Sequence, residues 1–222
     1  MRMWKKVILI VLAVLILLLG GLYLWQRENI HALIKVFVSD SQVIADELDS
    51  KRAEHHEAME EAAGGELTVK PVTTEQGRDL IDGKVTADEV KDAMGVAQPT
   101  ETEAVGITKQ NLVDQCVAEL YAYKVDVMAY LGGLKQAAID QWNGLEKSQR
   151  TSAKKMEISM DGLRKCYAYE AQVDGRVQEI LASYRAKMAE IGEDSKPIDD
   201  LWYFYCDEKE AEKAYYFDRY LN

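Results

Sequence analysis

The sequence predicts an all-α protein: an N-terminal transmembrane helix continuing into a stalk helix, then an antiparallel coiled-coil hairpin with a third, C-terminal helix. Three observations support this fold class. An uncharged apolar run extends from Val7 to Trp25. In the rest of the chain, apolar residues recur every three or four positions, which is the helical period. Only 3 prolines occur in 222 residues, which leaves long windows for uninterrupted helices.

The first predicted element is a membrane anchor over residues 7–25. A helix rises about 1.5 Å per residue, so roughly 20 apolar residues cross a hydrocarbon core about 30 Å thick. A cleaved signal peptide is the alternative, but no Ala-x-Ala cleavage site follows the run, and the first cysteine is Cys116. Within this anchor, we expect Val7, Leu12, Leu19, Tyr23 and Trp25 to be among the residues that contact the bilayer.

Positive charges precede the anchor at Arg2, Lys5 and Lys6, although Arg27 and Lys35 follow it. The positive-inside rule therefore favours a cytoplasmic tail of residues 1–6. We expect a single-pass protein of the cell membrane with the bulk of its chain extracytoplasmic and the lipid bilayer as a partner.

A stalk helix is predicted for residues 26–63. Its seam steps by four and three through Ile30, Ile34, Phe37, Ser41, Ile44 and Leu48. The next seam positions, Lys51 and His55, are polar, so we expect the seam to weaken there. The seam could pack on later helices of the same chain or on a second copy. For His55 and His56 we expect a solvated charged face and no metal, because neighbouring helical residues point about 100° apart.

Residues 64–107 are predicted to form a flexible linker that contains a small helical hairpin at 74–95. Thr86 and Glu89 have capping-box spacing, and Gly95 is suited to a C-terminal cap. Asp82, Gly83 and Glu89 fit part of a calcium loop, but Arg78 and Leu80 occupy positions that need oxygen ligands, which excludes a standard site. The stretch GRDLIDGKVTADEVKDAMG, residues 77–95, resembles the short C-terminal domain type of helix-turn-helix module. That resemblance implies a docking or oligomerisation role.

Residues 108–222 are predicted to form the coiled-coil domain, with helices at 108–143, 148–191 and 197–221. Thr108 has the side chain of an N-cap, and Asn143-Gly144 interrupts the pattern. The predicted seam of the second helix contains Met156, Met160, Leu163, Tyr167, Glu170, Asp174, Val177, Leu181, Tyr184, Met188 and Ile191.

The three cysteines form no CxxC pair. Short connections place long helices antiparallel, which puts Cys116 level with Val173 and too far from Cys166 for a disulfide. One disulfide among Cys116, Cys166 and Cys206, or three buried thiols, are otherwise open alternatives.

The third helix is rich in aromatic residues. Consecutive aromatic side chains point around a helix, so some of them face away from the hairpin. Packing within the chain, a partner surface and glycan stacking are the three interpretations. The candidate interaction surface contains Trp202, Phe204, Tyr205, Tyr216 and Tyr220.

A resemblance to a known family lies in three segments of the last half of the chain. They are CVAELYAY at 116–123, AQVDGRVQEIL at 171–181 and EKEAEKAYYFDRYL at 208–221. They resemble an uncharacterised family of membrane-anchored helical coiled-coil envelope proteins of Gram-positive bacteria. Members carry a second cysteine near the place of Val173, where this chain departs from the pattern. The resemblance implies no enzymatic activity.

The net charge and the motifs of the chain exclude several classes of function. The net charge is −11, and residues 1–6 carry three positive charges, so the rest of the chain carries −14. Such an acidic chain is unsuited to nucleic acid or anionic lipid, which require clustered Lys and Arg. Glu170 and Asp174 are the sole acid–base candidates, and a pair without a nucleophile or metal motif favours a hydrated break in the coiled coil.

The sequence therefore predicts an extracytoplasmic scaffold or protein-interaction module of the cell envelope, without catalysis, cofactor, metal or small-molecule substrate. Its partner would be another protein, or a second copy bound through the helical seams. The alternatives are a regulatory or sensory accessory subunit that relays a ligand or cell-wall signal through the stalk and the small hairpin, and an envelope enzyme that uses Glu170 and Asp174.

Overall fold

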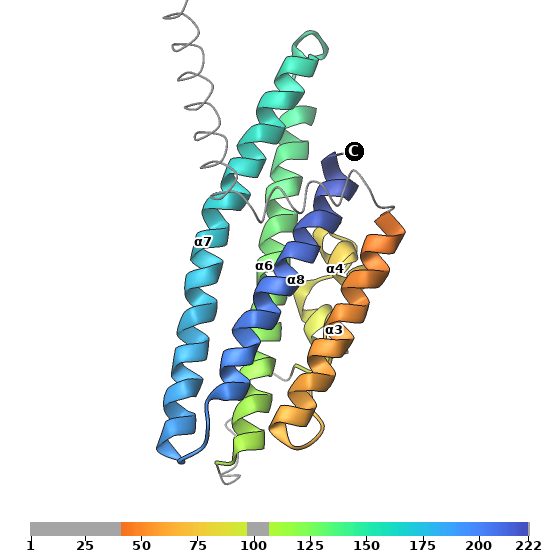
Figure 1. The fold of residues 1–222 in the computed structure, drawn as a ribbon. Coiled ribbons are helices and arrows are strands. Elements are labelled where there is room, and N and C mark those ends of the chain that lie inside the picture. Colours follow the sequence, from red (N-terminus) through yellow and green to blue (C-terminus); the bar gives the residue numbers. More distant parts are fainter. Residues whose placement is uncertain (1–40, 97–106, 222) are drawn as a thin grey trace, which may run out of the picture. The chain divides into compact units, whose positions relative to one another are not determined.

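The computed structural model describes residues 41–96 and 107–221, and these residues contain helices and no strands (Figure 1). The elements are α3 (Ser41–Ala63), α4 (Thr74–Ile81), α5 (Ala87–Met94), α6 (Lys109–Asn143), the 3-10 helix η1 (Lys147–Gln149), α7 (Ser152–Glu190) and α8 (Lys196–Leu221). The all-α prediction is confirmed for this part of the chain. No helix within it has an apolar stretch sufficient to cross a bilayer, and the predicted anchor at 7–25 lies outside the described residues.

The chain divides into two compact units. The larger unit is Asp49–Tyr205. In the smaller unit the structure describes residues 41–48 and 206–221.

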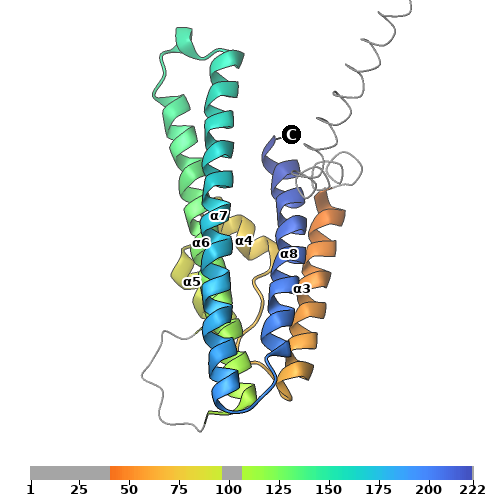
Figure 2. The same ribbon diagram turned by 60° about the vertical axis from the view of Figure 1, so that its left-hand side comes forward.

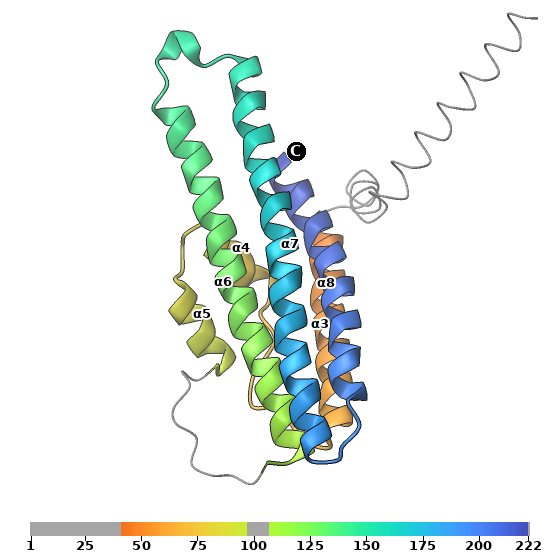
Figure 3. The same cartoon turned by 90° about the vertical axis from the view of Figure 1, so that its left-hand side faces the viewer.

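In the larger unit, α6 and α7 lie side by side and antiparallel, as Figures 2 and 3 show. The turn between them is longer than the break at Asn143-Gly144 suggests. Arg150 closes it by donating to the backbone carbonyls of Asn143 at 2.7 Å and Leu145 at 3.1 Å. Thr151 then caps α7 by accepting from the amide of Lys154, so α7 begins at Ser152 and not at residue 148.

The core of this unit lies at the end of the hairpin where α7 turns into α8. It joins Leu112, Val113, Cys116 and Val117 of α6 to Val177, Leu181, Tyr184 and Met188 of α7, and to Met59, Ile198 and Leu201. Burial of these side chains is the main stabilising contribution, at roughly 25 cal/mol per Å² of apolar surface.

The opposite half of α7 departs from the predicted seam. Met156, Met160 and Tyr167 are 64%, 48% and 41% exposed, whereas Ile158, outside that seam, is buried. The physical reason is that the two halves of α7 pack on different numbers of helices. Near its start α7 buries only the side that faces α6, whereas further along it also packs on α8, which adds a second buried side that contains Leu181.

The seam of α3 also differs from its prediction. In the smaller unit, Ile44 and Leu48 are buried and pack on Ala211, Ala214 and Tyr215 of α8, so this part of the seam packs within the chain. In the larger unit the buried stripe does not weaken. It continues through Arg52, His55, Met59 and Ala63, because the polar members have partners of their own.

Candidate functional site

The short helices α4 and α5 owe their ends to local hydrogen bonds. Thr86 accepts from the amide of Glu89 at 3.3 Å, and the Glu89 carboxylate accepts from the amide of Thr86 at 2.7 Å. This confirms the predicted capping box. The hydrogen bonds that the Glu89 carboxylate accepts from the Thr86 amide and hydroxyl lower the pKa of Glu89. Gly95 ends α5 with φ of 74°, the left-handed conformation that favours glycine.

A second capping box, between Thr73 and Gln76 at the start of α4, was not predicted. Its Thr-x-x-Gln spacing is readable in the sequence.

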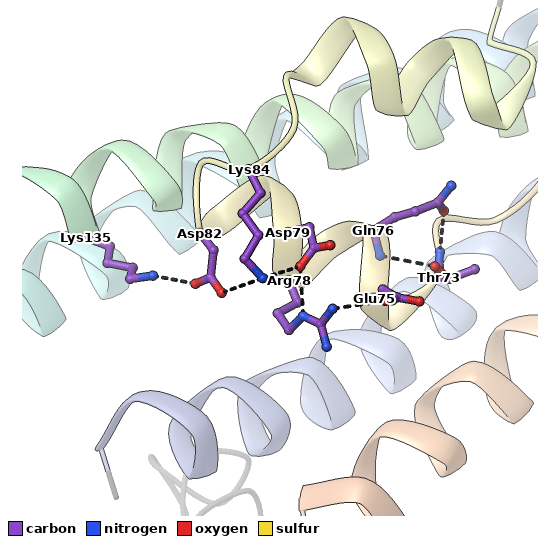
Figure 4. Close-up of polar contacts among 8 residues, drawn as sticks. All are labelled: Thr73, Glu75, Gln76, Arg78, Asp79, Asp82, Lys84 and Lys135. Atoms are coloured by element: carbon purple, nitrogen blue, oxygen red, sulfur yellow. Dashed lines mark hydrogen bonds and ion pairs between the residues drawn. The ribbon is translucent and has the colours of Figure 1, made fainter.

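A chain of ion pairs runs along α4 and onto α6 (Figure 4). Arg78 contacts Glu75 at 3.1 Å and Asp79 at 2.9 Å, and Lys84 contacts Asp79 at 2.9 Å. Asp82 then pairs with Lys135 of α6. The Arg78 guanidinium, followed by the Lys84 ammonium, lowers the pKa of Asp79. Asp82, one of the residues that fit part of a calcium loop, is therefore engaged by Lys135 and, at 3.9 Å, by Lys84.

Further contacts hold residues 64–96 against α6. The Thr68 amide donates to the Asp114 carboxylate at 2.7 Å, and Lys91 pairs with Asp126 at 2.6 Å. Val90 and Met94 are buried. We name residues 66–96 the insert. The insert lies docked on the hairpin of α6 and α7.

The backbone at the end of α4 lies close to α6 at Gly132. A Cβ atom built there would lie 3.1 Å from the carbonyl oxygen of Ile81, 3.2 Å from its Cα and 3.3 Å from the carbonyl oxygen of Leu80. These are backbone atoms, so a side chain at Gly132 pushes on the last turn of α4 itself. The neighbouring Gly133 has open space around its Cβ position.

We expect Gly132→Ala to loosen α4 and Gly133→Ala to stabilise α6 by up to about 1 kcal/mol, the helix propensity of alanine over glycine. Amide hydrogen exchange of residues 74–94 should be at least several-fold faster in Gly132→Ala than in Gly133→Ala. Equal exchange in the two variants would contradict the close approach.

The start of α4 is tied to α3 by polar groups, of which Arg52 and Thr74 are buried and Asp49 is partly exposed. Asp49 accepts from the Thr74 amide and hydroxyl, both at 2.8 Å, and from Arg52 at 3.0 Å. Arg52 also donates to the Thr74 hydroxyl at 3.0 Å and is only 2% exposed. A buried guanidinium needs such partners to offset its lost hydration.

The two histidines of α3 point to different neighbours. His55 is buried and stacks on Phe204 of α8, with ring centroids 4.2 Å apart. His56 lies 3.4 Å from the Tyr121 hydroxyl and 3.6 Å from Glu60. The solvated face expected for both is wrong for His55. In the described part of the chain, no three His, Cys, Asp or Glu side chains are grouped in a way that could hold a metal ion.

The carboxylate pair of α7 lies where α8 packs on the hairpin. Asp174 accepts a hydrogen bond from the Tyr205 hydroxyl, and Glu170 is partly buried. The polar break in the α7 seam therefore receives a polar side chain from α8. In this arrangement Asp174 positions a helix, which is a structural role.

The predicted aromatic surface is divided between packing and exposure. Trp202, Phe204 and Tyr205 are partly buried against the core of the larger unit, and Tyr216 packs on the cluster around Ile44 in the smaller one. The side chain of Tyr220 lies outside the described residues. Tyr203, not included in the prediction, is 67% exposed.

Cys116 and Cys166, the pair predicted to lie too far apart for a disulfide, are not joined by one. Cys116 is buried among apolar residues, which raises the pKa of its thiol. Such a thiol is unreactive.

The largest exposed apolar side chains of the hairpin gather on its half near η1, which we name the arm, residues 130–167. They are Tyr130 and Ile139 of α6, and Met156, Met160 and Tyr167 of α7. The α7 residues were predicted to lie in a buried seam, so their exposure was not predicted. Exposed apolar groups that gather on one element commonly mark interaction sites.

Comparison with known proteins adds no relative: no protein-family model matches the chain, and no curated protein or solved structure is significantly similar to it. The resemblance to Gram-positive envelope proteins is therefore still a prediction.

Proposed function

We propose that this chain is a membrane-anchored helical interaction module of the cell envelope, and that its arm presents apolar side chains to a protein partner. The observation that carries the proposal is the exposure of Met156, Met160 and Tyr167 on a helix whose other half is buried in a core. Single exposed apolar residues are ordinary, but a row at helical spacing is suited to a partner helix.

The proposed location in the cell membrane rests on the apolar run at 7–25 and on the basic residues that precede it. The net charge of −11 favours a protein partner over nucleic acid. Catalysis is not part of this proposal, because Asp174 is bonded to Tyr205 and no His lies near it in sequence.

A regulatory or sensory subunit is the second candidate. The polar contacts of the insert favour it: the pairs Lys91–Asp126 and Lys84–Asp79 each include a side chain that is at least half exposed. Exposed ion pairs contribute only about 0–1 kcal/mol each, so a ligand could replace these two pairs at modest cost. A ligand-dependent change in hydrogen exchange confined to residues 74–95 would favour this candidate.

The proposed function is tested with a photo-crosslinking amino acid introduced into the full chain in intact cells. Placed at Met156 or Tyr167, it should give a discrete protein adduct after illumination. Placed at Lys165, which is 58% exposed but on the opposite side of α7, it should give none. The proposal is wrong if Met156 and Tyr167 give no adduct, or if the chain is recovered outside the membrane fraction.

A further inference from the structure

The exposed row on α7 has the spacing of a coiled-coil seam. Met156, Met160, Leu163 and Tyr167, which we name the α7 stripe, are spaced four, three and four residues apart. Leu163 is half-buried and the other three are exposed. Further along α7, Leu181, Tyr184 and Met188 are buried. The seam is therefore covered in one half of the helix and open in the other.

The residues beside the stripe indicate what covers it. With Met156 and Leu163 at heptad position d and Met160 and Tyr167 at a, position e holds Glu157 and Arg164, which are opposite in charge. Position g holds Ser159 and Cys166, which are uncharged at neutral pH. One edge of the stripe thus carries a complementary pair of charges and the other edge carries none.

That pattern is complementary to itself in one orientation. In an antiparallel pair of helices, e positions face e positions, so Glu157 of one copy meets Arg164 of the other, and the two-fold axis repeats the contact. In a parallel pair, e faces g, and neither charge meets an opposite one. A two-fold contact uses the same patch on both copies, as this arrangement requires.

Both side chains are accessible for this contact. Glu157 is 63% exposed and Arg164 is 72% exposed, and their partners within α7 are Lys154 at 2.8 Å and Asp161 at 3.8 Å. Such exposed pairs are weak, so they can be exchanged for contacts to a second copy.

We propose that the α7 stripe binds the α7 stripe of a second copy of this chain, antiparallel, about a two-fold axis between Met160 and Leu163. This inference rests on the proposed function, for which it names the partner. Tethering of both copies in one membrane would raise their effective concentration, which helps a short seam to associate.

The register is tested by disulfide crosslinking of the full chain in membranes. Two differently tagged chains, one with Met156→Cys and one with Tyr167→Cys, are co-expressed with Cys166→Ser and Cys206→Ser in both. In the antiparallel register residue 156 faces residue 167 of the other copy, whereas two copies of residue 156 are about 16 Å apart along the axis. A disulfide needs Cα atoms about 4.4–6.8 Å apart. Mild oxidation should therefore link the mixed pair, and neither variant should link to itself.

The charges are tested in the same cells without disturbing the fold, because both residues are exposed. Glu157→Arg alone, or Arg164→Glu alone, should lower the yield of the mixed disulfide roughly fivefold, since like charges then face each other. The double exchange, Glu157→Arg with Arg164→Glu, should restore it. Lys165→Glu, on the opposite side of α7, is the matched control and should leave the yield unchanged.

Three results would overturn the inference: no mixed disulfide, self-linking of Met156→Cys, or single exchanges that have no effect on the yield. The photo-crosslinks keep this failure distinct from failure of the proposed function. If Met156 gives an adduct with a different protein and no mixed disulfide forms, self-pairing is refuted. The proposed function as an interaction module is then retained. The absence of any adduct refutes both.

Discussion

Replacement of Leu181 with alanine is expected to lower the free energy of unfolding of the Asp49–Tyr205 unit by about 2–5 kcal/mol. Leu181 is fully buried and belongs to the cluster that joins α6, α7 and α8. The variant loses the transfer free energy of the side chain and leaves a cavity in a core formed by several helices, which closes only partly.

The measurement is chemical denaturation of the full chain in mild detergent, with unfolding monitored by far-UV circular dichroism. Glu179→Ala is the matched control on the same helix, since its side chain is 70% exposed, and it should change stability by less than about 0.5 kcal/mol. A loss below about 1 kcal/mol for Leu181→Ala would mean that α8 does not close the core as described.

Replacement of Asp49 with alanine is expected to cost about 2–3 kcal/mol and to release the start of α4. Asp49 accepts three hydrogen bonds, two of them from Thr74, and its loss deprives the buried Arg52 of one carboxylate. Unsatisfied buried donors cost about 1–3 kcal/mol each.

This second prediction is checked by the same denaturation and by hydrogen exchange at residues 73–77. Asp49→Asn keeps one acceptor oxygen and should lose about half as much stability as Asp49→Ala. Glu54→Ala, at an exposed position of α3, should leave exchange in α4 unchanged. Equal effects of Asp49→Ala and Glu54→Ala would show that Asp49 is not a link between α3 and the insert.

Features set by hydrogen bonds between near neighbours were predictable from the residues alone. Thr86 with Glu89, Thr108 at the start of α6 and Gly95 at the end of α5 all occur as expected. Each cap satisfies backbone groups within three or four residues of itself, so no distant part of the chain needs to be known. The positions in the sequence where one helix ends and the next begins, and the all-α fold class, follow from the same local rules.

Features that depend on which helix lies opposite were not predictable. Arg52 and His55 are polar residues of α3, yet both are buried, because Thr74 and Phe204 come from other parts of the chain to meet them. Conversely, Met156 and Met160 are apolar and at seam spacing, yet they are exposed. Hydrophobic periodicity identifies a face of a helix but not what covers it.

By itself, then, the sequence determined the helices, their caps and the spacing of the α7 stripe, because helix formation and capping depend on near neighbours. The tertiary structure alone decided which half of that seam is buried. Burial depends on contacts between residues far apart in the chain, and α8 reaches Asp174 through Tyr205 while Met156 and Met160 stay exposed.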